Sequence, residues 1–253
     1  MSLSQLPIHA RISSSAYPHK FLRFAKENPS VTKFFFILLV LDLLFIVIFL
    51  INGISIALLG SGEKFPPFWS LAADYSAPEF FGYAKLLITS VLLFSVFKRS
   101  RIPIFASWAF IFFVLLLDDS LQLHEFGGEW VSGLMPDQQA WYGIQLHHFG
   151  ELFIWAVLGL ICLIVLVTGI VKSKGQASHY TRLFLLAVFG LILCGVVIDL
   201  LSSFDFIMHP ENQTMMTQIL HGVLIVAEDG GELVFMSLAA AIAYFAWLNV
   251  QKR

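Results

Sequence analysis

Six long apolar stretches, separated by short polar connections, dominate the chain. They fall near residues 34–59, 79–98, 102–125, 140–171, 181–204 and 214–250. About 20 apolar residues in a helix cross the hydrocarbon core of a bilayer, and each stretch is long enough to do so. The connections carry turn-forming residues, as in Gly60-Ser61-Gly62, Pro66-Pro67, Gly127-Gly128, Pro136-Asp137 and His209-Pro210. The pattern predicts an all-α integral membrane protein with six transmembrane helices.

Lysine and arginine alternate between the two sides of these predicted helices. The N-terminal arm, every second connection and the C-terminal tail contain Arg11, Lys20, Arg23, Lys26, Lys33, Lys98, Arg99, Arg101, Lys172, Lys174, Arg182, Lys252 and Arg253. The opposite connections contain only Lys64. Because basic residues are enriched in cytoplasmic loops, both the N- and C-termini are predicted to be cytoplasmic. The chain is therefore divided into a cytoplasmic N-terminal arm, residues 1–33, and a six-helix membrane domain, residues 34–253.

Composition narrows the class of protein further. Of the residues, 58% are hydrophobic and 13% are charged, whereas a soluble domain carries about 25% charged residues. The lipid bilayer is therefore the expected environment, either a plasma membrane or a bacterial inner membrane, and no motif predicts binding to nucleic acid. Cys162 and Cys194 lie within apolar runs and predict no disulfide framework. The sequence leaves open whether the protein forms an oligomer or binds a membrane partner subunit.

Four of the apolar stretches turn acidic at one end, and histidines accompany the acids. The residues concerned are Asp118, Asp119, His124, Glu125, His147, His148, Glu151, Asp199, His221, Glu228, Asp229 and Glu232. The apolar parts 102–117 and 152–171 would measure roughly 24–30 Å as helices, close to the thickness of the hydrocarbon core. The acidic layer is therefore expected near the outer interface, with helices 3, 4 and 6 extended beyond it.

Helical spacing places several of these groups on shared faces. The predicted sets are His221 with Glu228 and Glu232, Asp118 with Gln122 and Glu125, and His147 and His148 with Glu151. Two adjacent histidines, His147 and His148, cannot both point inward from a straight helix, so one should be a capping, outer-layer or interfacial group. Two further predictions concern lone charges. Asp42 is expected to form a hydrogen bond at a helix contact, and Glu79 is expected either to pair with Lys85 or to have a functional role.

Carboxylates and imidazoles at membrane depth usually face one another, an ion or a water-filled cavity. No cysteine lies near these groups, and mixed oxygen and imidazole ligation suits iron, manganese or zinc. The predicted metal ligands are Asp119, His124, His148, Glu151, His221, Glu228 and Glu232. Asp118, Glu125 and Asp199 are predicted to be catalytic acids that orient histidines or move protons. So many carboxylates would over-neutralise one ion, so a pair of divalent metal ions, iron or manganese in preference to zinc, is expected.

Three functions compete for this constellation. The first is a membrane-embedded metalloenzyme that acts on a lipid-like or other apolar substrate, an oxidoreductase in preference to a hydrolase because the ligands are rich in oxygen. The second is a divalent-cation or proton-coupled transporter. Transport needs a polar path to the cytoplasm, yet 102–117 offers only Ser107 and 152–171 only Thr168. The third is a haem-binding membrane cytochrome with His148 and His221 as ligands, although the surrounding acids make a poor haem pocket.

Overall fold

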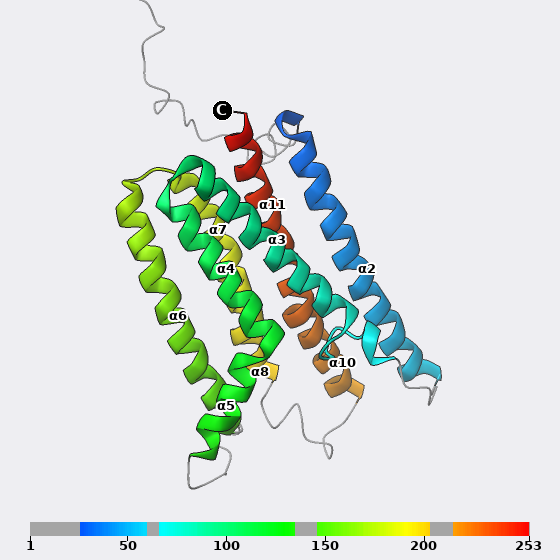
Figure 1. Ribbon diagram of the computed structural model, residues 1–253. Coiled ribbons are helices and arrows are strands. Elements are labelled where there is room, and N and C mark those ends of the chain that lie inside the picture. The colour runs from blue at the N-terminus through cyan, green and yellow to red at the C-terminus, as the bar shows by residue number, and fades with distance from the viewer. Residues whose placement is uncertain (1–25, 60–65, 135–145, 203–214, 253) are drawn as a thin grey trace, which may run out of the picture.

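The computed structural model describes residues 26–59, 66–134, 146–202 and 215–252, which form helices and short connections with no strand (Figure 1). The helices in chain order are α2 (Pro29–Leu59), η2 (Pro67–Trp69), α3 (Ala77–Ser100), α4 (Pro103–Leu121), α5 (Leu123–Gly133), α6 (Leu146–Ser173), α7 (Ser178–Ile192), η3 (Leu193–Ile198), α8 (Asp199–Ser202), α10 (Met215–Ile225), η5 (Val226–Gly230) and α11 (Gly231–Gln251). Of these, η2 is a short 3-10 helix, whereas η3 and η5 are π-helical. The predicted connections around Gly60, Pro136 and His209 lie outside the described residues.

Six helices within the described residues are long and apolar enough to cross a membrane, which confirms the predicted all-α, six-helix architecture. They are Pro29–Ser55, Ala77–Ser100, Pro103–Leu121, Leu146–Ser173, Ser178–Ser202 and Ile219–Gln251. The start of α2 and the end of α11 lie at the same end of the bundle (Figure 1). The cytoplasmic location of that end stays a prediction, as does the extension of helices beyond the outer interface.

Helix α11 lies at the centre of the bundle and packs against α2, α3 and α7, while α4 packs against α3 and α6. Its inward face is made of alanines, which let neighbouring backbones come close. Ala239, Ala240, Ala243 and Ala246 are all fully buried. Beside them, the ring of Phe184 lies 5.3 Å from that of Trp108 and completes the aromatic part of the core. The part of the bundle around these residues is therefore a largely apolar core.

The stretch 102–125, predicted as one helix, is divided at Gln122. This residue ends α4 and precedes α5 with a left-handed backbone conformation, at a φ of 49°. The predicted connection at Gly127-Gly128 is wrong, because both glycines lie inside α5. There, a Cβ atom on Gly128 would overlap the backbone of Glu151, so this glycine serves a close contact between α5 and α6.

Two π-helical segments, η3 and η5, face each other at the level of the acidic residues. Such segments occur mostly as single turns inside α-helices and frequently lie at functional sites. A Cβ atom on Gly195 would overlap the Glu232 carboxylate, and one on Gly231 would lie 2.6 Å from Cys194 Sγ. The glycines thus leave room for a carboxylate between the two helices.

A buried ion pair joins three helices just below the acidic layer. Lys85 Nζ on α3 lies 2.7 Å from Asp42 Oδ1 on α2 and donates to the carbonyl oxygen of Leu233 on α11, also at 2.7 Å. Ser237 Oγ donates to Asp42 Oδ2 at 2.5 Å. Asp42 therefore forms the expected helix-contact hydrogen bond. Of the two alternatives for Glu79, the pairing with Lys85 is excluded, because Lys85 binds Asp42 and Glu79 binds Tyr75 and Tyr83. A functional role for Glu79 stays a prediction.

Candidate metal centre

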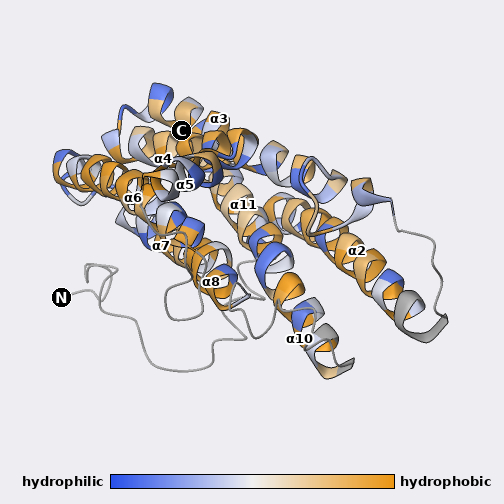
Figure 2. Cartoon of the chain, turned by 90° about the horizontal axis from the view of Figure 1, so that it is seen from below, coloured by the Kyte–Doolittle hydropathy of each residue, from blue (hydrophilic) through white to orange (hydrophobic). Residues whose placement is uncertain are grey.

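A cavity of about 510 Å³ lies at the end of the bundle opposite the start of α2 and the end of α11. Figure 2 views this end and shows hydrophilic positions on helices that are otherwise mostly hydrophobic. Nine acidic residues line the cavity: Asp74, Glu79, Asp119, Glu125, Glu151, Asp199, Glu228, Asp229 and Glu232. Three histidines, His124, His148 and His221, line it with them. Among the described lining residues there is no lysine or arginine.

The cavity brings together nine of the ten residues predicted from the sequence to form the site. The nine are Asp119, His124, Glu125, His148, Glu151, Asp199, His221, Glu228 and Glu232. The tenth, Asp118, is fully buried behind His124. Their roles as metal ligands and proton carriers stay predictions.

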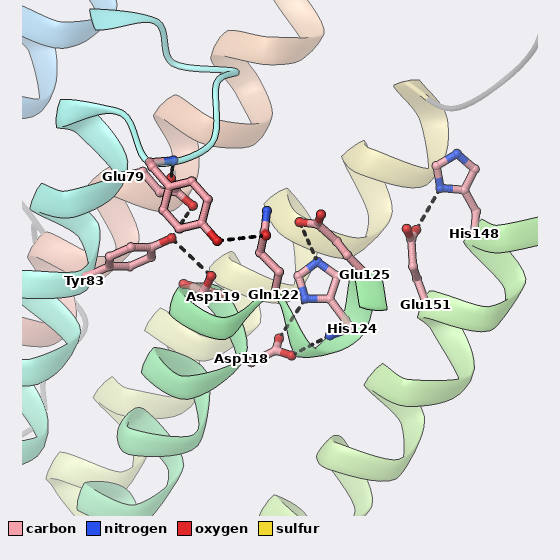
Figure 3. Close-up of polar contacts among 10 residues, drawn as sticks. Glu79, Tyr83, Asp118, Asp119, Gln122, His124, Glu125, His148 and Glu151 are labelled. Carbon is pink, nitrogen blue, oxygen red and sulfur yellow. Dashed lines mark hydrogen bonds and ion pairs between the residues drawn. The ribbon is translucent and has the colours of Figure 1, made fainter. Parts of the chain in front are cut away.

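His124 is held in place by the buried carboxylate of Asp118 (Figure 3). His124 Nδ1 lies 3.1 Å from Asp118 Oδ2, and the backbone N–H of His124 donates to Asp118 Oδ1, also at 3.1 Å. The ring centroids of His124 and Trp155 are 5.2 Å apart, which fixes the imidazole from a second side. An imidazole that donates from Nδ1 to a carboxylate presents Nε2 as a ligand atom, as in many metal sites. The break at Gln122 makes this geometry, because it turns α5 back toward Asp118.

The charges around His124 also set its protonation. Burial alone would lower the pKa of His124, but the hydrogen bond and charge of Asp118, with the charges of Glu125 and Asp119, raise it above the ordinary value of 6.5. Burial raises the pKa of Glu125, while His124 opposes this shift and neighbouring acids add to it. These carboxylates thus favour the protonated form of the His124 imidazole in the metal-free site.

We expect the contribution of the His124–Asp118 pair to the stability of the metal-free protein to decline as pH rises. Since folding raises the pKa of His124, this contribution is complete below about pH 6.5 and is lost as pH rises through the folded-state pKa. Thermal unfolding of chelator-treated protein in detergent, between about pH 5 and about pH 9, would measure it. The difference in Tm between wild type and Asp118→Asn should be largest at acidic pH. A difference that stays constant across the range would contradict the prediction.

A second compact group lies at the start of α6. His148 Nδ1 is 2.8 Å from Glu151 Oε2 (Figure 3), and the ring centroids of His147 and His148 are 3.9 Å apart. One ligand atom from each of His147, His148 and Glu151 can be chosen so that all three lie within 4.8 Å of one another. Of the two histidines, His148 lines the cavity. The sequence analysis did not include His147 among the ligands, because adjacent side chains diverge on a straight helix.

Two other walls of the cavity offer further donor atoms. On α10, His221 Nδ1 is buried and has no hydrogen-bond partner among the described residues. On η5, Glu228 Oε2 accepts a hydrogen bond of 3.3 Å from Ser202 Oγ of α8. A buried ring nitrogen without a partner is unfavourable unless another group, an ion or water completes it, so His221 is a candidate ligand.

Residues that the sequence analysis did not select cover the cavity on the α3 side. The Tyr83 hydroxyl donates to Glu79 and lies 3.1 Å from the carbonyl oxygen of Asp119 (Figure 3). Tyr75, in the segment before α3, donates from its backbone N–H to Glu79 and from its hydroxyl to Gln122 Oε1 at 3.2 Å. These contacts hold residues 71–74 against the cavity, which they help to line. The four-residue spacing of Glu79 and Tyr83 was the available sequence signal for their contact.

Comparison with known proteins places the chain in a family. A family model described as Domain of unknown function (DUF8692) matches residues 34–248. The chain belongs to this family. The DUF8692 match includes every described residue that lines the cavity. No curated protein and no solved structure matches the chain.

Proposed function

We propose that the protein is a membrane-embedded metalloenzyme with a carboxylate and histidine site for two divalent metal ions. The observation that carries the proposal is one cavity of about 510 Å³ onto which nine carboxylates and three imidazoles converge. So many acids at one place repel each other strongly unless cations or protons neutralise them. Two divalent metal ions would supply four positive charges within the cavity and so neutralise part of this repulsion.

The donor set fits iron, manganese or zinc. His148 and Glu151 already lie side by side, His124 is oriented by Asp118, and His221 offers a nitrogen that has no partner within the described part of the chain. Hard oxygen donors mixed with imidazoles suit iron or manganese best and zinc next. Asp119, Glu228 and Glu232 would complete two coordination spheres from α4, η5 and α11. Helix bundles build di-metal sites in this way, with carboxylates from facing helices.

The residues have distinct roles in this proposal. Asp118 fixes the ring of His124, while Glu125 and Asp199 lie at the cavity wall where they can accept or return protons. When bound, the metal ions supply Lewis acidity and activation of oxygen or water. An oxygen-rich ligand set favours an oxidoreductase over a hydrolase. With both termini cytoplasmic, the cavity lies near the outer interface, where a lipid-like or other apolar substrate can reach it from the bilayer.

Metal analysis of detergent-purified protein tests the proposal. We expect about two iron or manganese ions per chain, as in other carboxylate-bridged bundles. Glu151→Ala and Glu228→Ala should each lower metal affinity about tenfold or more, since each removes a ligand. Inductively coupled plasma mass spectrometry measures the metal content.

Glu129→Ala is the matched control, because Glu129 is an exposed residue of α5 outside the cavity lining. Its metal content should equal that of the wild type. About one zinc ion per chain, lost in the two site variants, would indicate the hydrolase alternative. Absence of stoichiometric metal from protein purified without chelators, and again after incubation with Fe²⁺, Mn²⁺ or Zn²⁺, would overturn the proposal.

One observation favours a second candidate, divalent-cation or proton-coupled transport. The Lys85–Asp42 pair and Ser237 lie directly below the cavity, and Leu233 both lines the cavity and accepts a hydrogen bond from Lys85. Polar groups therefore continue from the cavity further into the bundle. If the protein carried metal ions or protons into liposomes, and Lys85→Met abolished this flux, the transporter would be favoured over the enzyme.

A further inference from the structure

A second, smaller cavity of about 30 Å³ lies against the inner side of the acidic site. It shares four residues with the larger cavity: Asp119, Trp155, Glu232 and Met236. Two predicted metal ligands, Asp119 and Glu232, therefore border both spaces. A group held in the small cavity would lie directly beside the proposed metal ions.

The remaining walls of the small cavity are entirely aliphatic. They are Leu86, Leu115, Val188, Leu191 and Ile192, from α3, α4 and α7. Leu86 and Leu191 are buried, whereas Ile192 exposes 48% of its surface on the lipid-facing side of α7. Ile192 thus borders both the small cavity and the exposed surface of α7.

Helices α6 and α7 make few contacts with each other beside this cavity. Helix α6 packs mainly against α4 and α5, whereas α7 packs mainly against α11. Trp155 of α6 and Val188 of α7 nevertheless line the same small cavity. The cavity therefore lies between two helices that make few backbone contacts with each other.

We propose that the small cavity binds a segment of the alkyl chain of a lipid, which enters from the bilayer past Ile192 between α6 and α7. About 10–15 Å³ of such space holds one water-sized group, so about two methylene groups fit. The aliphatic walls favour hydrocarbon over water. A lipid headgroup is too large for a cavity of about 30 Å³, so the chain enters rather than the headgroup. The inference rests on the proposed function only in taking this bound segment to be the part of the substrate that reacts.

Photolabelling tests the proposal. The full-length protein in phosphatidylcholine vesicles is exposed to one of two probes with the same diazirine-bearing acyl chain, a free fatty acid or a phosphatidylcholine. We expect light-dependent labels on Leu115 or Val188, identified by peptide mass spectrometry. The two probes distinguish a free alkyl substrate from a membrane phospholipid, and labelling by either supports the proposal.

Filling the cavity provides the decisive comparison. Val188→Trp should lower labelling at Leu115 about tenfold, because the methylene groups lose their apolar site. Ile192→Trp should do the same from the half-exposed access point, where a larger side chain is compatible with folding. The matched control is Leu186→Trp, which changes a lipid-facing residue of α7 that exposes 56% of its surface and does not line the cavity. Its labelling should equal that of the wild type.

Labels confined to lipid-facing residues such as Leu186 and Phe189 would overturn the proposal. Labelling of Leu115 that persists in both Val188→Trp and Ile192→Trp, with both variants folded, would also overturn it. Metal content is measured in the same samples and is expected to be unchanged in all three variants. If the purified protein binds no metal but the probe still labels Leu115, the metalloenzyme proposal is refuted and the alkyl-chain site is supported. The two proposals therefore fail separately.

Discussion

Asp42→Ala should destabilise the protein by about 3–5 kcal/mol, since it would leave the Lys85 cation buried without its ion partner. The side chains of Asp42 and Lys85 are 0% and 1% exposed, so water cannot replace the lost carboxylate. Removing one member of a buried pair is far more harmful than removing both. Reversible unfolding in mixed detergent micelles would measure the free energy of unfolding.

The double variant Asp42→Leu with Lys85→Met is the matched comparison. It removes both charges while keeping similar volume, and we expect it to recover most of the lost stability. Ser237→Ala removes one hydrogen bond to Asp42 and should cost about 1 kcal/mol. If Asp42→Ala were as stable as the wild type, Lys85 would have to be neutral in the folded protein or to have another anionic partner.

Gly150→Ala should separate α5 from α6 and disrupt the proposed site. A Cβ atom on Gly150 would overlap the carbonyl oxygen of Gly128 and lie 2.8 Å from its Cα atom. Because backbone atoms cannot move aside as a side chain can, we expect a loss of about 1–3 kcal/mol in the free energy of unfolding. His124 on α5 would also move away from Glu151 on α6. Metal content should therefore fall together with the melting temperature.

Gly159→Ala on the same helix is the control for helix propensity. A Cβ atom on Gly159 would meet no heavy atom within 4 Å. Alanine should therefore be tolerated there and can raise helix stability by up to about 1 kcal/mol. Equal melting temperatures and metal contents in the two alanine variants would show that α5 and α6 are not held together at Gly128 and Gly150.

Hydropathy was sufficient to predict the six membrane-spanning lengths, because every backbone polar group in lipid must be satisfied within a helix. The same reasoning selected the residues of the cavity. Asp199 and Glu228, for example, are costly at the ends of apolar helices unless they face a shared polar space. Hydropathy thus predicts where polar groups gather, although it does not predict what they bind.

Other features could not be predicted from spacing along the chain. The partner of Lys85 is 43 residues away on α2, whereas the nearer Glu79 is held by two tyrosines. The break at Gln122 occurs without glycine or proline, the residues that usually signal one. These features depend on contacts between helices, which a local pattern does not contain.

Insertions and deletions within the π-helical segments η3 and η5 would rotate one part of each helix relative to the other. A π turn holds about one more residue than an α turn, so it rotates the following residues by roughly 100° about the helix axis. One residue within Val226–Gly230 therefore sets the direction in which His221 and Glu228 point relative to the alanine face of α11. Loss of one residue there would leave the apolar core and its register intact while turning the outer half of the helix away from the cavity. The rotation of the cavity residues about the helix axis is thus independent of the packing of the apolar core. Insertions or deletions in η3 and η5 could change the cavity without changing the core.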